Sequence, residues 1–98
     1  MNKPKEFNEI QNKLLDIPTW EYSSEYISKT YTLNNFQQAI NFTNMVADVA
    51  EQMDHHPDIL IFGWNKVRIT LSTHSAKGLT QLDFDLSDKI EKIFNNLK

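Results

Sequence analysis

Residues 58–72 read DILIFGWNKVRITLS, two runs rich in apolar residues joined by Gly-Trp-Asn. The stretch predicts a strand over 58–62, a turn over 63–65 and a second strand over 66–72. In the second strand, polar residues alternate with three apolar ones, Val67, Ile69 and Leu71. One face of that strand should pack on the core, and the other should meet water or a binding site. The short connection makes the pair antiparallel.

A long helix is predicted before this hairpin, from a cap at Asn34 or Asn35 to about Met53. Its main apolar stripe consists of Phe36, Ala39, Ile40, Thr43, Val46, Ala47, Ala50 and Met53. A second, offset stripe consists of Phe42, Met45 and Val49. The second stripe would be exposed in a monomer, so it predicts a partner helix in a homodimer or homotetramer. The alternative is one wide apolar face buried within its own domain.

The two ends of the chain predict the remaining elements. Residues 6–15 predict a helix whose apolar face is formed by Phe7, Ile10, Leu14 and Leu15. Residues 19–33 are rich in Trp, Tyr, Thr and Ile and predict a hairpin that turns near Ser23-Ser24. A last helix begins after Thr80, which has capping-box spacing to Asp83. The apolar side of that helix consists of Leu82, Leu86, Ile90, Ile93, Phe94 and Leu97.

The predicted order is α-β-β-α-β-β-α, an α+β fold within a single domain of residues 1–98. Helices separated by hairpins imply an antiparallel sheet with helices covering one face. A domain of this size also gains from burying more surface in an oligomer.

Composition excludes several functional classes. Ten Lys and Arg are scattered among thirteen Asp and Glu, and the net charge of −3 argues against a nucleic-acid partner. The chain has no cysteine, which excludes disulfides and thiolate nucleophiles. The longest apolar run, residues 59–62, is far too short for a membrane span or a signal peptide. We therefore expect a cytoplasmic protein with no membrane partner.

All three histidines fall in two loops at junctions between predicted elements. His55 and His56 follow the long helix, and His74 follows a strand. Residue 58 begins one strand of the hairpin and residue 72 ends the other, so antiparallel pairing places both loops at one edge of the sheet. Three imidazoles then converge on one small volume. Two groups with an unperturbed pKa of about 6.5 could give one proton to a substrate and take another.

Three carboxylates lie near these histidines in the predicted fold. Glu51 precedes His55 by four residues on the same side of the helix, Asp54 is adjacent, and Asp83 begins the last helix. These carboxylates could orient the imidazoles or hold the polar edges of a ligand.

Plainer interpretations of the same residues stay open. The two adjacent histidines can cap a helix end, Asp83 can be only a helix cap, and Glu51 can be a solvated residue. Three histidines with carboxylates can also hold zinc or another divalent metal. Against a metal, adjacent histidines point in divergent directions and Pro57 stiffens the turn, so we expect none.

Five segments together resemble the pterin-4a-carbinolamine dehydratase family: EQMDHHP at 51–57, WNKV at 64–67, TLSTH at 70–74, GLT at 78–80, and Asp83. The resemblance covers the chain from about residue 20 to its end. It implies three helices on one face of a four-stranded antiparallel sheet. It also implies a lyase without coenzyme or metal that dehydrates 4a-hydroxytetrahydrobiopterin to the quinonoid dihydropterin. That reaction would link the protein to an aromatic amino-acid hydroxylase, whose tetrahydrobiopterin cofactor it regenerates.

The same resemblance implies roles for individual residues. His55 and His74 resemble the acid-base pair of the family, and His56 resembles the residue that mainly holds the pterin. The implied substrate-binding positions are Glu51, Asp54, His56, Ser72, Thr73 and Asp83. Two alternatives remain: a dimerising protein-interaction module on the same scaffold, and an enzyme for a related, molybdopterin-type pterin. Three clustered imidazoles favour an enzyme, because an interaction module has no need for them.

Overall fold

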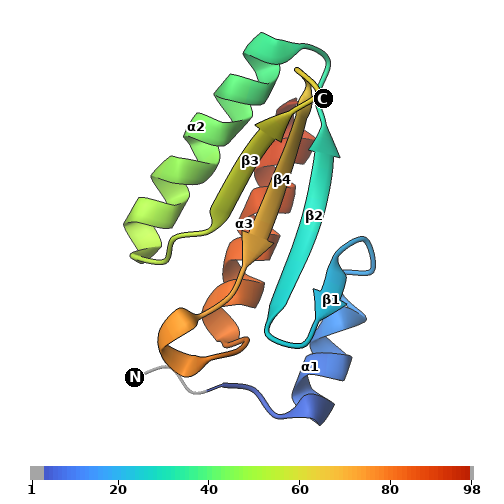
Figure 1. Ribbon diagram of the computed structural model, residues 1–98, viewed down its shortest axis with the longest axis vertical. Helices are drawn as coiled ribbons and strands as arrows, with labels where there is room; N and C mark the ends of the chain where they lie inside the picture. Colours follow the sequence, from blue (N-terminus) through green and yellow to red (C-terminus); the bar gives the residue numbers. More distant parts are fainter. Residues whose placement is uncertain (1–3, 98) are drawn as a thin grey trace.

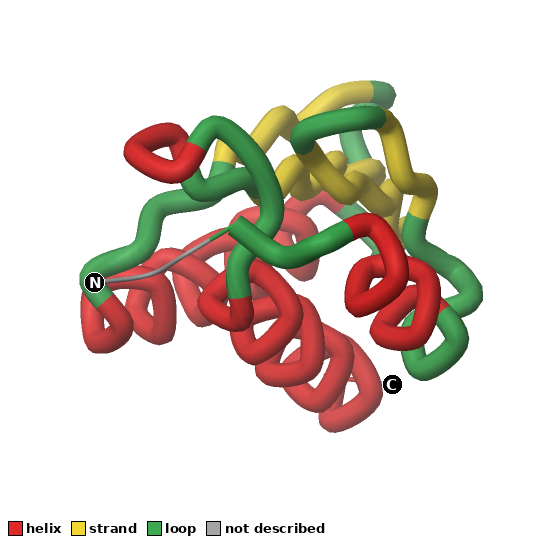
Figure 2. The backbone as a smooth tube through the Cα atoms, turned by 90° about the horizontal axis from the view of Figure 1, so that it is seen from below, coloured by secondary structure: helices red, strands yellow, loops and turns green. Residues whose placement is uncertain are grey.

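The computed structural model describes residues 4–97 and contains one antiparallel sheet of strand order β1-β2-β4-β3 (Figure 1). The strands are β1 (Glu21–Ser23), β2 (Tyr26–Thr32), β3 (Asp58–Phe62) and β4 (Lys66–Leu71). The helices are α1 (Phe7–Leu14), α2 (Phe36–Met53) and α3 (Gln81–Leu97). Figure 2 shows all three α-helices on one side of the strands. The predicted order and fold class are confirmed, and a short 3-10 helix, η1 (His74–Ala76), lies within the predicted loop after β4.

The hairpin of β3 and β4 forms as its sequence predicts. Gly63 and Trp64 both have positive φ, at 54° and 57°, within the three-residue loop that joins Phe62 to its partner Lys66. Asn65 fixes this turn to the end of β2, because its amide donates to the Leu33 carbonyl at 3.0 Å. The core side of β4 is fully buried at Val67, Ile69 and Leu71.

Helix α2 begins at the predicted cap, where the Asn35 side chain accepts a hydrogen bond from the Gln38 amide at 2.8 Å. Its buried face consists of Ala39, Phe42, Val46 and Ala50. The expectation that Phe42 faces a partner helix is wrong, since its side chain is 0% exposed and its ring packs 4.9 Å from that of Tyr31. The spacing explains the difference: Phe42 is three residues after Ala39 and four before Val46, which is one helix face.

The rest of the offset stripe divides between core and surface. Val49 packs against the core, whereas Met45 remains 40% exposed. Phe36, from the stripe expected to face the sheet, is also exposed. The alternative of one wide apolar face is therefore correct for Phe42 and Val49, while α2 still presents apolar side chains at its surface.

Helix α1 uses only half of its predicted apolar face. Ile10 is buried and Leu14 packs against the core, but Phe7 and Leu15 are exposed. No helix within residues 4–97 is long and apolar enough to cross a membrane.

Three connections meet at one end of the sheet (Figure 1). They are the loop from α2 to β3, the segment from β4 through η1 to α3, and the turn between β1 and β2. The pairing explains this, because Thr70 near the end of β4 lies opposite Asp58 at the start of β3 and Ser28 near the start of β2. The predicted meeting of the two histidine loops at one edge is confirmed.

Candidate active site

His55 occupies the first loop position after α2 and is almost buried. The helix ends at Asp54, whose left-handed conformation (φ 50°) turns the chain inward. The backbone amide of His55 then donates to the Ala50 carbonyl at 3.0 Å. The ring, in a residue only 8% exposed, places Nε2 2.7 Å from Oδ1 of Asp83. His55 therefore meets the carboxylate of α3 and not one from its own helix.

Asp83 is 0% exposed, and both of its oxygens are used. Oδ2 accepts hydrogen bonds from the Thr73 hydroxyl at 2.8 Å and from the Thr80 backbone amide at 2.9 Å. The hydroxyls of Thr73 and Thr80 lie 2.8 Å apart and share a further hydrogen bond. We call His55, Thr73, Thr80 and Asp83 the Asp83 network. Asp83 is thus both the predicted cap of α3 and the partner of an imidazole.

His56 pairs with Glu51 at the surface. Its Nε2 lies 2.9 Å from Oε1 of Glu51, and both side chains are more than half exposed. The expectation that Glu51 lies beside His55 is wrong, because Asp54 leaves the helical path before the four-residue spacing can continue. An exposed pair of this kind adds little to stability, so the contact mainly orients the His56 ring.

His74 lies on η1 beside a hollow of about 340 Å³ on the open face of the sheet. The residues that line this hollow, the His74 pocket, are Glu25, Tyr26, Asp58, Thr70, Ser72, His74 and Lys77. The Ser72 hydroxyl donates to the Glu25 carbonyl at 2.7 Å and so ties the turn between β1 and β2 to the end of β4.

Residues 72–74 connect the pocket to the Asp83 network. Ser72 and His74 line the pocket, while Thr73 between them is buried and reaches Asp83. An extended chain sends alternate side chains to opposite faces, which is the local cause of this division. His74 thus faces the pocket, while its neighbour Thr73 reaches Asp83, the partner of His55. Glu51 lies in the last turn of α2, and Asp54 and His56 follow that helix. None of the three lines the pocket.

Some residues of this region carry no signal in the sequence. Glu25, Tyr26 and Lys77 reach the pocket only through folding, and Thr80 belongs to the network as well as to a helix cap. For Thr80, the capping-box spacing to Asp83 indicates a helix cap and the Gly-Leu-Thr segment a family resemblance, but neither indicates the hydrogen bond to Thr73. Within residues 4–97, no three His, Cys, Asp or Glu side chains gather as a metal site would require.

A second, partly buried polar cluster joins β2 to α3. Oε1 of Glu91 on α3 accepts hydrogen bonds from the Lys29 ammonium, the Tyr31 hydroxyl at 2.6 Å and the Trp20 indole at 3.2 Å. We call these four residues the Glu91 network. Burial alone would raise the pKa of Glu91, but the hydrogen bonds from Lys29, Tyr31 and Trp20 outweigh it and lower that pKa. Burial and the adjacent Glu91 raise the pKa of Tyr31 far above its ordinary value.

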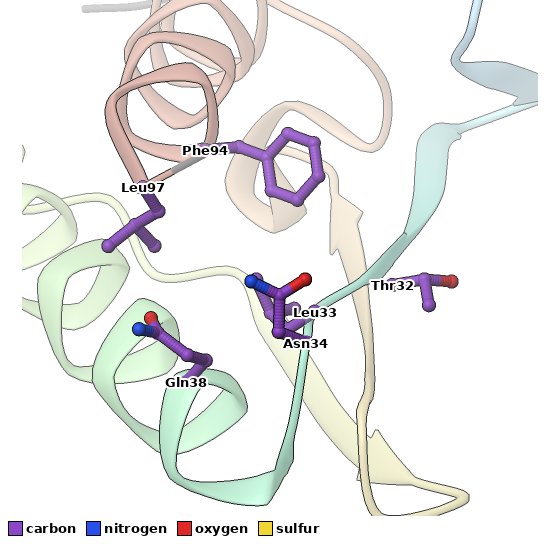
Figure 3. Close-up of a pocket in the computed structure, with 6 residues that line it drawn as sticks. All are labelled: Thr32, Leu33, Asn34, Gln38, Phe94 and Leu97. Atoms are coloured by element: carbon purple, nitrogen blue, oxygen red, sulfur yellow. The ribbon is translucent and has the colours of Figure 1, made fainter.

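Another hollow, of about 360 Å³, lies at the opposite end of β2 (Figure 3). It is lined by Thr32, Leu33, Asn34, Gln38, Phe94 and Leu97. These residues include no ionisable side chain, so this hollow offers no group for proton transfer. The predicted site residues all lie elsewhere.

Comparisons with known proteins agree with the resemblance in the sequence. A family model described as pterin 4 alpha carbinolamine dehydratase matches residues 3–93. Two relatives carry that family name: one from Sulfolobus acidocaldarius, 41% identical over 88% of this chain and 93% of its own, and one from Herpetosiphon aurantiacus, 48% identical over 87% and 88%.

Two solved structures share the fold. A transcriptional coactivator/pterin dehydratase from Brucella melitensis superimposes with a TM-score of 0.87 at 30% identity, over 93% of this chain and 98% of that chain. A pterin dehydratase-like RuBisCO assembly factor of the alpha-carboxysome superimposes with a TM-score of 0.63 at 20% identity, over 76% and 86%. At that identity the second structure shows a common fold alone.

Proposed function

Because the chain belongs to the pterin-4-alpha-carbinolamine dehydratase family, we propose that it converts 4a-hydroxytetrahydrobiopterin to quinonoid dihydropterin and water. In this reaction the N5 lone pair forms a double bond to C4a as the C4a hydroxyl leaves. The departing oxygen takes up one proton, and N5 loses one. A positioned acid and a positioned base each contribute about 10²–10⁴-fold to such a reaction.

The observation that carries the proposal is the division of residues 72–74 between the pocket and the Asp83 network. It supports His74, which lines the pocket, and His55, which is linked to the same segment through Asp83 and Thr73, as the acid-base pair. An ionised carboxylate can only accept, so Nε2 of His55 carries its proton toward Asp83, and Nδ1 is left to act as a base. Asp83 then stabilises the positive charge that the ring gains.

The remaining predicted residues take supporting roles in this proposal. Asp83 is too deeply buried to touch a pterin, so we assign it the positioning of His55 in place of substrate contact. His56, oriented by Glu51, would hold the pterin, and Asp54 and the Ser72-Thr73 backbone would meet its polar edge.

The test is to follow the dehydration of enzymatically generated 4a-hydroxytetrahydrobiopterin spectrophotometrically, with wild type and four variants. His55→Ala and His74→Ala should each lower kcat by about 10²–10⁴-fold, and the double variant should fall to background. His56→Ala should mainly raise KM. Circular dichroism confirms that each variant is folded. A folded double variant with wild-type kcat would show that these histidines do not carry the chemistry.

The proposed chemistry uses imidazoles alone, so turnover should survive exhaustive chelation. The measurement is the same assay after dialysis against EDTA, with and without added Zn²⁺. Loss of turnover that zinc restores would overturn the proposal in favour of a metal mechanism.

We also propose that the protein is a homo-oligomer that buries the exposed side chains of Phe36 and Met45 on α2. Light scattering at micromolar concentration should give a dimer or a larger assembly. A monomeric mass would contradict this part of the proposal.

A further inference from the structure

The turn between β1 and β2 forms one wall of the His74 pocket. Glu25 and Tyr26 line the hollow, although they are some fifty residues from His74 in the sequence. The bond from the Ser72 hydroxyl to the Glu25 carbonyl, at 2.7 Å, anchors the turn two residues before His74. The wall is therefore held in a fixed place relative to that imidazole.

The side chains around this hollow are free to meet a ligand. Within the described residues, the carboxylates of Glu25 and Asp58, the Tyr26 hydroxyl, the Lys77 ammonium and the His74 ring make no hydrogen bond or ion pair with the protein. His55 and His56, by contrast, are both paired with carboxylates. The pocket thus gathers acceptors, one cation and an aromatic ring in about 340 Å³, the size of small-molecule sites.

The position of each group decides which part of a substrate it can reach. Asp58 comes three residues after His55 and so lies toward the reacting end. Glu25 and Tyr26 close the pocket from the other hairpin. A pterin carries two adjacent donors, the 2-amino group and N3–H, on the pyrimidine ring, and a carboxylate can accept both at once. A phenol ring offers a flat surface for the bicyclic ring system.

We infer that Glu25 and Tyr26 are specificity-determining residues: Glu25 accepts hydrogen bonds from the 2-amino group and N3–H of the pterin, and Tyr26 packs against its ring. This inference rests on the proposed function, because it takes His74 to mark the reacting end of the pocket. Glu25 thereby distinguishes a 2-aminopteridine from a 2-oxopteridine, which presents an acceptor where the pterin has a donor.

The first experiment measures binding without catalysis. Dissociation constants for pterin and for lumazine, the 2-oxo analogue, are determined by calorimetry for wild type, Glu25→Gln and Glu21→Gln. The dissociation constant of wild type should be about 10–30-fold lower for pterin than for lumazine, which corresponds to one charge-assisted hydrogen bond. Glu25→Gln should reduce the preference to about twofold or less. Glu21→Gln, the same charge change on an exposed residue of the same hairpin outside the pocket lining, should retain it.

The second experiment uses the dehydration assay. Glu25→Gln should raise KM about tenfold and leave kcat within about twofold, because the contact is made equally in ground and transition states. Tyr26→Ala should raise KM about fivefold, whereas Tyr26→Phe, which keeps the ring, should match wild type.

The outcomes separate this inference from the proposed function. Wild type could catalyse dehydration and prefer pterin while Glu25→Gln keeps the full preference. In that case the role of Glu25 is wrong and the proposed dehydratase activity is retained. If wild type binds neither compound and does not accelerate dehydration, both are wrong. A wild-type protein that turns over but binds pterin and lumazine equally would also overturn the specificity role of Glu25.

Discussion

The Asp83 and Glu91 networks are both polar clusters beneath the sheet, but they balance their negative charge differently. Glu91 faces Lys29, a permanent cation, together with two neutral donors from Tyr31 and Trp20. Asp83 faces neutral donors from Thr73 and Thr80, and its one partner able to take a positive charge is the imidazole of His55. The net charge of the Glu91 network is therefore fixed, whereas that of the Asp83 network changes if His55 gains or loses a proton.

In the proposed mechanism, this difference separates a structural network from a catalytic one. The lowered pKa of Glu91 and the raised pKa of Tyr31 hold both groups in one protonation state across neutral pH. Their network ties α3 to β2 and can serve stability alone. The Asp83 network instead contains His55, the imidazole that we propose as a catalytic base. We therefore expect substitutions in the two networks to act on different measured quantities.

The largest effect is expected for Asp83→Asn, which removes the charge opposite His55 while keeping the shape. We predict a fall in kcat of about 10²-fold and a loss of about 2 kcal/mol in the free energy of unfolding. Steady-state kinetics and urea denaturation measure the two quantities. Asp85→Asn is the matched control, because Asp85 is exposed in the first turns of the same helix. A folded Asp83→Asn variant with kcat within twofold of wild type would remove the distinction between the networks.

Glu91→Gln should change stability without changing turnover. It leaves the Lys29 ammonium, which is largely buried, without its partner carboxylate. We expect the free energy of unfolding to fall by about 2 kcal/mol, with kcat within twofold of wild type. Asp88→Asn is the control, since it breaks only an exposed pair with Lys92 on the same helix. A tenfold loss of kcat in folded Glu91→Gln would show that this network also serves the chemistry.

A smaller effect is expected in the pH dependence of the stability difference between wild type and Glu91→Gln. The pKa of Glu91 is lowered in the folded protein, so below about pH 4.5 the unfolded chain binds the proton more readily. The contribution of Glu91 to the free energy of unfolding is therefore present above that pH. It is lost as the pH falls toward the pKa of Glu91 in the folded protein. Urea denaturation from pH 8 to pH 3 should show a constant gap between wild type and Glu91→Gln that narrows at the acid end. A gap that widens there would contradict the assigned direction.

The smallest effect is expected for Thr80→Val, which removes one hydroxyl from the Asp83 network. That hydroxyl bonds to Thr73 and accepts from the Leu82 amide, so its loss should cost about 1 kcal/mol in stability. An Asp83 carboxylate that is held less firmly should lower kcat about threefold. Thr80→Ser, which keeps the hydroxyl, should have the wild-type stability and kcat. Equal losses in the valine and serine variants would indicate a packing effect in place of a hydrogen bond.

The elements that the sequence predicted well are those with a strong local pattern. Alternation of polar and apolar residues predicts β4, and a cap at Asn34 or Asn35 predicts the start of α2, where the structure has Asn35. Two offset stripes predict different environments for Ala39 and Phe42, but α2 buries both residues on one face. Helical spacing predicts Glu51 beside His55, because periodicity does not show that the left-handed residue Asp54 ends the helix between them.

The order of helices and strands, the dehydratase family and the position of three histidines at one end of the sheet all follow from local patterns in the sequence. Which carboxylate each imidazole meets, and which residues close the pocket, follows from the folded arrangement alone. His55 finds Asp83 28 residues away, and Ser72 finds Glu25 47 residues away. Periodicity and capping report on neighbours within one or two turns of chain, whereas these contacts depend on how the sheet pairs its strands and where α3 packs beneath it.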